Sequence, residues 1–383
     1  MTKEKQEKID KLFMEANKKF GKGASQFGNS KIEAFPIFSS TGSLNLDIAF
    51  GIMGIPKGRI IELFGAESSG KTTLALVMIA NIQKAGGICA FVDAEHALDR
   101  LWAMKLGVNV DELIISQPDS GEDALSLTEM YIESDAIDFV AVDSVAALTP
   151  LAEIEGEMGD AQMGAQARLM GKGLRKISPK CGKHNCTVLF LNQIRMKIGV
   201  MFGSPETTPG GNALKFFSSI RMRISNNGSI TDKSDETGQF SKDIKIKVLK
   251  NKLAPPFMIA KCKLHTNEVD RVYGFDSYEE LVNLAVIDGI INKAGSWYSY
   301  KGERLGQGSA NVAKFFKENP SIYAEVYNKI IGNIQETQKA VIDSFSQTVR
   351  ETAEEIVLKK TRKPKEDAIK EGSIIEVKAE KVE

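Results

Sequence analysis

One segment of the chain has the residue types and spacing that hold phosphate groups, Gly65-Ala66-Glu67-Ser68-Ser69-Gly70-Lys71-Thr72. It fits the pattern G-x-x-x-x-G-K-[ST], follows an apolar stretch ending at Phe64 and precedes a predicted helix. The glycines let backbone N–H groups turn toward phosphate oxygens, and the helix N-terminus adds a positive dipole. Lys71 would neutralise the β and γ phosphates, and the Thr72 hydroxyl would bind Mg²⁺. The segment therefore predicts a site for a nucleoside triphosphate with Mg²⁺.

Three further acidic residues follow apolar stretches that read as buried strands. Asp143 follows the run 139–142 and would hold Mg²⁺ through water, because ligands bind at the carboxyl ends of parallel strands. Asp93 and Glu95 follow the run 88–92, and either carboxylate would accept a proton from water attacking the γ-phosphate. Their spacing alone does not separate these two candidates.

The pattern around these residues predicts an α/β fold with a mostly parallel sheet flanked by helices. Continuous apolar runs indicate strands buried on both faces, at 59–64, 88–92, 113–115, 139–142 and 187–191. Helices are expected over 72–84 and 121–134. The segments 221–225 and 244–248 alternate like half-exposed strands.

The remaining segments suggest a division into four parts. Residues 1–34 read as an amphipathic helix over 4–20 and a glycine-rich linker, and 35–268 form the core. Residues 269–330 form a small C-terminal α/β domain with helices over 278–285 and 311–317. Residues 331–383 continue a long helical region, 321–360, into a charged tail expected to be disordered.

Composition limits the class of protein and its compartment. The 383 residues include 50 basic and 50 acidic side chains, so a nucleic-acid partner needs a local patch rather than bulk charge. Met1–Lys8 has no apolar segment of a signal peptide, and no run of about 18 apolar residues predicts a membrane span. The four cysteines are expected to be reduced in the cytoplasm, and Cys181 to Cys186 is expected to be a surface turn rather than a metal site.

Seven blocks of sequence together resemble the bacterial-type RecA recombinases, which bacteria and phages encode. The resemblance runs from about Phe20 to Pro320 and keeps the family's order. The blocks are Ser40–Leu44, Gly65–Thr73, Val92–Asp99, Val142–Pro150, Glu153–Gly159, Asn192–Gly203 and Lys293–Tyr300. The resemblance implies a RecA-type phosphate-loop ATPase core.

By this resemblance the nucleotide is ATP, held by Gly65 through Thr73 with Asp99 and Trp102 at the adenine. Glu95 is then the residue that activates water, and Gln193 the γ-phosphate sensor that couples nucleotide state to the following loop. Trp102 stands where tyrosine is more usual, and its indole still offers a stacking face. The stretch 264–266 has no aromatic at a second adenine contact of the family.

The resemblance also implies two DNA-contacting loops, about 153–164 and 195–209. The second is too rich in glycine and proline for regular structure, and it carries cations for phosphates and apolar side chains for bases. Arg168 and Arg175 are spaced i and i+7 on a predicted helix. The implied DNA-binding residues are Met163, Arg168, Arg175, Arg195, Met196, Lys197, Ile198, Val200, Gly210, Gly211 and Asn212.

Four residues are implied to act between subunits of a helical filament. Lys250 and Lys252 match a pair that reaches the neighbour's nucleotide and stabilises charge on the γ-phosphoryl group. Phe216 matches an interface residue, and the N-terminal helix with Phe20 would dock on the adjacent subunit. The basic cluster near 359–365 replaces an acidic tail, so regulation by such a tail is not expected here.

The expected function is therefore that of an ATP- and single-stranded-DNA-dependent recombinase. It would pair the bound strand with a homologous duplex in DNA recombination, repair and the SOS response, with a LexA-type repressor as a further candidate partner and no membrane partner. A ring-forming helicase on the same ATPase core is one alternative, and the loop 195–209 and the block 297–300 argue against it. A filament protein that only binds ATP is another alternative. The residues that argue against it are Lys71, Glu95, Asp143 and Gln193.

Overall fold

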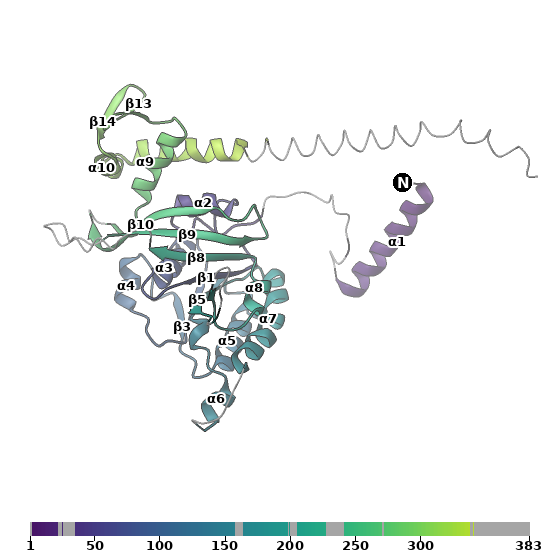
Figure 1. The fold of residues 1–383 in the computed structure, drawn as a ribbon. Helices are drawn as coiled ribbons and strands as arrows, with labels where there is room; N and C mark the ends of the chain where they lie inside the picture. Colours follow the sequence, from purple (N-terminus) through teal and green to yellow (C-terminus); the bar gives the residue numbers. More distant parts are fainter. Residues whose placement is uncertain are drawn as a thin grey trace, which may run out of the picture. The chain divides into compact units, whose positions relative to one another are not determined.

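A nine-stranded sheet organises the first of two compact units, Met1–Glu280 and Leu281–Glu383, in the computed structural model (Figure 1). The structure describes residues 2–21, 25, 35–157, 164–197, 199, 205–226, 241–269, 272–337 and 340. Met163, Ile198 and Val200, most of the linker, parts of both implied DNA loops and nearly all of the tail lie outside these ranges.

The strands of this sheet run in the order β11-β10-β9-β8-β1-β5-β4-β2-β3. The six strands from β8 to β3 pair in parallel, and β9, β10 and β11 extend the sheet in antiparallel pairs. Their bounds are β1 (Ile60–Gly65), β2 (Cys89–Asp93), β3 (Leu113–Ser116), β4 (Phe139–Asp143), β5 (Thr187–Gln193), β8 (Ile220–Asn226), β9 (Ser241–Asn251), β10 (Ile259–Val269) and β11 (Val272–Phe275).

Helices cover both faces of the sheet, because alternate residues of each strand point to opposite sides. Ile61 and Leu63 of β1 join the core with helix α3 (Lys71–Lys84), whereas Ile60 joins the core on the other face with α5 (Gly121–Glu133) and α7 (Ala165–His184). Helices α5 and α7 pack against each other. The short helices are α2 (Leu44–Phe50), α4 (Arg100–Lys105), α6 (Leu151–Glu155) and α8 (Ala213–Phe217). The predicted α/β fold class is confirmed.

The burial of the strands follows the sequence pattern. Strands β1, β2 and β4 are buried at every residue, as their continuous apolar runs predict. Strand β8 alternates between buried and partly buried residues, as expected for 221–225. Among the described helices, none is both long and apolar enough to cross a lipid bilayer.

Helix α1 (Lys3–Phe20) forms over the predicted range and has no buried residue. The side chains of Leu12, Met14 and Phe20 are 59%, 72% and 73% exposed. The helix therefore carries apolar side chains that its own unit does not cover.

The second unit is a small sheet with helices. Helix α9 (Ser277–Ile287) leads into the antiparallel strands β12 (Asn292–Ala294), β13 (Trp297–Tyr300) and β14 (Glu303–Gln307), and α10 (Ser309–Glu318) follows. Residues 320–337 are helical. Val312, Phe316, Val326 and Ile330 are buried in its core. The units divide between Glu280 and Leu281, later than residue 269, because β11 still belongs to the large sheet.

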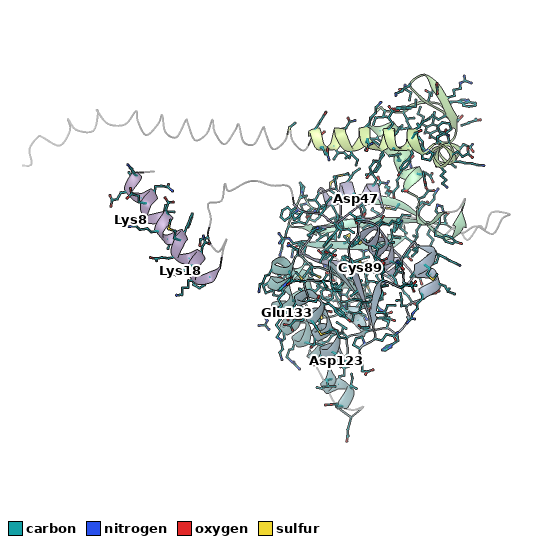
Figure 2. All side chains as sticks on the ribbon, turned by 180° about the vertical axis from the view of Figure 1, so that it is seen from behind. Lys8, Lys18, Asp47, Cys89, Asp123 and Glu133 are labelled. Atoms are coloured by element: carbon teal, nitrogen blue, oxygen red, sulfur yellow. The ribbon has the colours of Figure 1, made fainter. Side chains whose placement is uncertain are left out.

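The surface turn predicted for Cys181 to Cys186 is wrong. Cys181 lies in the last turn of α7 and Cys186 directly precedes β5, and both thiols are buried in the core beneath α7. Cys89 lies in the interior of the same unit (Figure 2). His184 Nδ1 contacts an Asp135 carboxylate oxygen at 2.6 Å. The cysteines pack as small apolar side chains, and burial raises the pKa of the Cys181 thiol to about 12.

A buried polar cluster joins the start of the core to the end of the first unit. Ser43 Oγ donates to Glu280 at 2.9 Å, and the Asn45 backbone N–H donates to the same carboxylate at 3.3 Å. Asp47 accepts from Ser40 Oγ at 2.5 Å and from the Thr41 backbone at 2.8 Å. Burial raises the pKa of Glu280 to about 7 and that of Asp47 to about 6, although these hydrogen bonds oppose the shift.

We expect the variant Glu280→Gln to gain stability relative to the wild type as pH rises from 5 to 8. A carboxyl group whose folded pKa is raised stabilises the fold while protonated, and this stabilisation is lost between about pH 4.5 and pH 7. An amide never ionises, so the difference in unfolding free energy should shift toward the variant by roughly 2 kcal/mol. Urea unfolding at both pH values measures it. Glu279→Gln, which removes an ion pair to Lys263, is the control and should show no such gain.

Candidate active site

The phosphate loop connects β1, which ends at Gly65, to α3, which begins at Lys71. A side chain on Gly65 would meet the Ile224 carbonyl oxygen at 2.5 Å, and Gly70 has a φ of 94°, so both positions require glycine. Ser69 Oγ closes the loop by donating to the Ala66 carbonyl at 2.7 Å. Lys71 Nζ donates to the same carbonyl at 2.8 Å, and burial lowers the pKa of this lysine. The lysine is thus held at the loop in which phosphates would sit.

The two predicted Mg²⁺ residues meet beside this loop. Thr72 Oγ1 donates to Asp143 Oδ2 at 2.7 Å, from the first turn of α3 to the end of β4. Burial raises the pKa of Asp143 to about 6, the Thr72 hydrogen bond opposes this, and the charge of Glu95 adds to it. A hydroxyl beside a carboxylate is a donor set that suits Mg²⁺, which keeps several waters and uses few protein ligands.

The structure distinguishes Asp93 from Glu95. Asp93 is 1% exposed, and its carboxylate accepts from the Ala97 and Leu98 backbone N–H groups and from Gln117 Nε2. Asp93 therefore stabilises the turn that follows β2. Glu95 is exposed and lies within reach of the phosphate loop, since its charge acts on both Lys71 and Asp143. Glu95 is therefore the more exposed of the two carboxylates.

Glu95 belongs to a chain of hydrogen bonds that leaves the nucleotide site. Its Oε1 accepts from Ser144 Oγ and, at 3.3 Å, from Gln193 Nε2. Gln193 Oε1 in turn accepts from Arg195 Nη1 at 3.0 Å. Gln193 ends β5, and Arg195 begins the predicted DNA-contacting segment. The amide of Gln193 thus joins the candidate catalytic carboxylate to an exposed arginine of that segment.

The predicted base contacts lie on α4 and the edge of the sheet. Asp99 caps α4 by accepting from the Trp102 backbone at 3.0 Å, and Trp102 Nε1 lies 3.4 Å from Thr73 Oγ1. The aligned stretch 264–266 lacks an aromatic, and His265 is buried beside Asp276 at 3.1 Å. Tyr273 of β11 instead packs edge-on against Trp102, with ring centroids 6.0 Å apart. Sequence reasoning missed this aromatic because its position depends on the β10–β11 pairing.

The second DNA segment begins and ends in a short ribbon. Strand β6 (Arg195–Met196) pairs with β7 (Glu206–Thr207), and the side chains of Arg195, Met196 and Lys197 are exposed. The described part of the first segment consists of the end of α6 and the residues to 157, followed by Gly164.

After the ribbon the chain turns tightly against α7. Gly210 and Gly211 have φ values of 81° and 72°, and a side chain on Gly211 would meet Ala167 at 2.8 Å. The Gly210 backbone donates to Gln166 Oε1 at 3.1 Å, and Asn212 precedes α8. Arg168 and Arg175 are exposed on the same helix, α7. The glycine turn that follows the ribbon therefore lies against the first turn of α7, the helix that carries Arg168 and Arg175.

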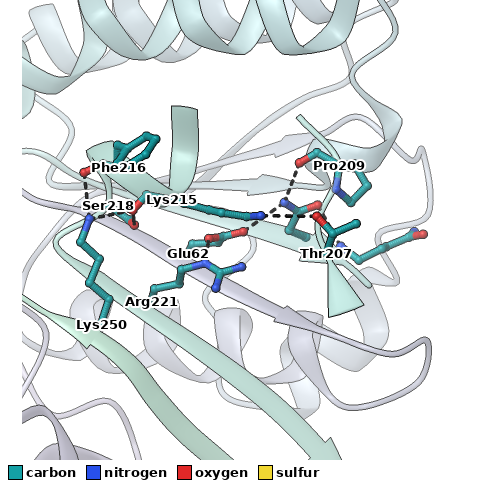
Figure 3. Close-up of polar contacts among 10 residues, drawn as sticks. Glu62, Thr207, Pro209, Lys215, Phe216, Ser218, Arg221 and Lys250 are labelled. Atoms are coloured by element: carbon teal, nitrogen blue, oxygen red, sulfur yellow. Dashed lines mark hydrogen bonds and ion pairs between the residues drawn. The ribbon is translucent and has the colours of Figure 1, made fainter. Parts of the chain in front are cut away.

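Three of the four residues implied to act between subunits, Lys250, Lys252 and Phe216, lie at the end of α8. Lys250 Nζ donates to the backbone carbonyls of Lys215 and Phe216 at 2.7 and 2.8 Å (Figure 3). Lys252 Nζ donates to the Phe216 carbonyl at 3.1 Å. Burial, reinforced by the charge of Lys252, lowers the pKa of Lys250 to about 8. The Phe216 side chain is 72% exposed. Both lysines thus cap a helix C-terminus next to an uncovered aromatic ring.

Comparison with known proteins identifies the family. Residues 7–269 match the RecA N-terminal domain and residues 279–335 the RecA C-terminal domain. Protein RecA of Legionella pneumophila (strain Corby) is 50% identical over 356 residues, covering 93% of this chain and all of that protein. Protein RecA of Paracoccus denitrificans is 52% identical, covering 85% and 90% of the two chains, and that of Psychrobacter arcticus is 55% identical, covering 83% and 87%.

The two family models span both compact units and include every strand of the large sheet except β11. They do not favour a ring-forming helicase or a passive filament protein. The chain belongs to the RecA family and is an ATP-binding recombinase with DNA-dependent ATPase activity.

Proposed function

We propose that this recombinase couples ATP at the phosphate loop to single-stranded DNA at segment 195–209 through Gln193. The chain of bonds from Glu95 through Gln193 to Arg195 carries the proposal, because one amide touches both sites. Gly65 through Thr73 would hold the phosphates, with Asp99 and Trp102 at the base. The edge-on contact between Trp102 and Tyr273 supports a base at that position.

The residues of this site have distinct tasks in hydrolysis. Mg²⁺, when bound, would neutralise charge on the β and γ phosphates, with Thr72 and Asp143 holding it. Lys71 would leave the Ala66 carbonyl and bond to phosphate oxygens. Gln193 would turn its amide to the γ-phosphate, which releases Glu95 to accept a proton from water. When Gln193 turns away from Glu95, Arg195 would also lose its hydrogen bond to the Gln193 amide. The presence of the γ-phosphate would thereby change the conformation of segment 195–209.

The proposal extends to assembly and partners. In a filament Lys250 and Lys252 would reach the neighbour's ATP, beside Phe216, and α1 with Phe20 would dock on the next subunit. The exposed aromatic side chains of Phe216 and Phe20 support such contacts between subunits. Single-stranded DNA, a homologous duplex and a LexA-type repressor are the proposed partners, and the bacterial cytoplasm is the proposed location. The division into N-terminal arm, core, C-terminal domain and tail stays a prediction.

The function is tested directly by a strand-exchange assay. The protein, bound to circular single-stranded DNA, should displace the matching strand of a linear homologous duplex in the presence of ATP and Mg²⁺. A heterologous duplex is the control and should give no product. Unwinding of a duplex in the absence of a homologous single strand would instead point to helicase activity. A protein that showed neither strand exchange nor unwinding would contradict the proposal.

We expect Glu95→Gln and Lys71→Ala to separate hydrolysis from binding. Glu95→Gln keeps the hydrogen-bonding shape but cannot accept a proton, so ATP hydrolysis on DNA should fall by about 100-fold or more with ATP affinity retained. Lys71→Ala removes the cation at the phosphates and should weaken ATP binding itself. Fluorescent-nucleotide binding and phosphate release measure the two effects. Loss of ATP binding in Glu95→Gln would overturn the role given to Glu95.

Filament assembly should take up a proton at Lys250 between about pH 8 and pH 10. In the single subunit burial lowers the pKa of this lysine to about 8, so above that pH it is mostly neutral. Phosphates of a neighbouring ATP favour the charged form and raise its pKa. Assembly should therefore weaken as pH rises through about 8, and an indicator dye at pH 9 should report proton uptake. Arginine stays charged, so Lys250→Arg should assemble without this uptake. Equal proton uptake by the wild type and by Lys250→Arg would show that Lys250 is not the group that takes up the proton.

A further inference from the structure

The DNA-contacting segment 195–209 starts and ends in a stem that is too small to be stable alone. The stem consists of the pairs Arg195 with Thr207 and Met196 with Glu206, extended by one bond from the Lys197 backbone to the Pro205 carbonyl at 2.9 Å. An isolated two-stranded ribbon of this length is not stable in water. Other contacts must therefore hold the stem at its place on the core.

A bidentate ion pair supplies such a contact. Arg223 Nε donates to Glu206 Oε2 at 2.8 Å, and Arg223 Nη2 donates to Glu206 Oε1 at 2.6 Å. The two side chains are 34% and 29% exposed, so the pair lies at the edge of solvent. Two parallel charge-assisted bonds fix orientation as well as distance, which a single lysine bond does not. The pair therefore fixes both the position and the angle of β7.

The arginine comes from a strand that borders the nucleotide site. Residue Arg223 of β8 is in register with Phe64 of β1, one residue before the phosphate loop begins. On the same face of β8, Arg221 pairs with the fully buried Glu62 of β1 at 2.5 Å. Backbone pairing from Ile220 to Ile224 holds β8 to β1 on both sides of the Arg223 position. A contact from β7 to β8 ties the stem to the strands that carry the phosphate loop.

The far end of the segment has its own attachment. Asn192 Nδ2 donates to Glu62 Oε1 at 3.1 Å and to the Pro209 carbonyl at 3.2 Å (Figure 3). Asn192 directly precedes Gln193 on β5. The buried hydrogen bonds of Asn192 thus hold the end of the segment at Pro209. The Glu206–Arg223 ion pair orients the β6–β7 ribbon, which lies between Pro209 and the exposed side chains of Arg195 and Lys197.

We propose that Arg223 is a positioning residue for DNA binding. It acts through Glu206 to keep the β6–β7 stem, and with it Arg195 and Lys197, in register with the nucleotide site. The inference rests on the proposed contact of segment 195–209 with single-stranded DNA. Arg223 itself touches neither DNA nor ATP, so its loss should affect how tightly DNA is engaged rather than the chemical step.

The test is a charge swap read out as DNA-dependent ATP hydrolysis. Arg223→Glu and Glu206→Arg should each raise the single-stranded DNA concentration needed for half-maximal turnover by about ten-fold, equivalent to about 1.4 kcal/mol. Turnover at saturating DNA and ATP affinity without DNA should stay within about two-fold. The double variant restores opposite charges and should recover most of the loss. A change in maximal turnover without a change in DNA requirement, or no recovery in the double variant, overturns the proposal.

Three further variants make the outcome interpretable. Arg223→Lys keeps the charge and loses the fork, so it should give an intermediate loss even if the charge reversals do not fold. Lys180→Gln breaks a similarly exposed pair with Glu129, 2.5 Å long, and should leave the DNA requirement unchanged. Arg195→Ala tests the segment itself. An unchanged DNA requirement there overturns the proposed DNA contact and this inference together, whereas a loss there with wild-type behaviour of all Arg223 variants overturns this inference alone.

Discussion

The site depends on one constraint, that parallel strands end at the same edge of a sheet. Strands β1, β2, β4 and β5 all finish there, and the residues that follow them converge although they are far apart in sequence. The phosphate loop follows β1, Glu95 follows β2, Asp143 ends β4 and Gln193 ends β5. Their side chains meet because the strand ends are held about 5 Å apart by backbone hydrogen bonds.

The same strand ends connect the site to the segment 195–209, which we propose contacts DNA. Strand β5 ends in two adjacent residues with different partners, since Gln193 contacts Glu95 and Asn192 holds the Pro209 carbonyl. One strand end therefore contacts the candidate catalytic carboxylate and both ends of the DNA segment. Strand β5 is buried along most of its length and should move little by itself, so the proposed response to ATP involves side chains and the ribbon beyond Gln193.

Buried charge has a different role on the two sides of the sheet. The Glu62 carboxylate is fully buried, and it accepts hydrogen bonds from Arg221 and Asn192. These bonds hold β1, β5 and β8 rigidly together at this position. Asp143 is also buried, yet burial and its neighbour Glu95 raise its pKa to about 6, so its charge is costly without a cation. Removing either partner of Glu62 should loosen the structure, whereas the raised pKa of Asp143 is consistent with its proposed role as a Mg²⁺ ligand.

Sequence by itself determined the fold class, the core strands and the phosphate loop, because continuous apolar runs and a glycine pattern depend on local chemistry. It also indicated Asp143 and the pair Asp93 and Glu95, since an acidic residue after a buried strand is a local signal, but this signal did not separate Asp93 from Glu95. Tertiary structure decided what no local pattern contains. In the folded chain Asp93 accepts hydrogen bonds from backbone N–H groups, and Cys181 and Cys186 are buried. Tyr273 of β11 packs against Trp102, and Glu206 forms an ion pair with Arg223. Each of these depends on strand order and register, which are set by how the whole sheet packs.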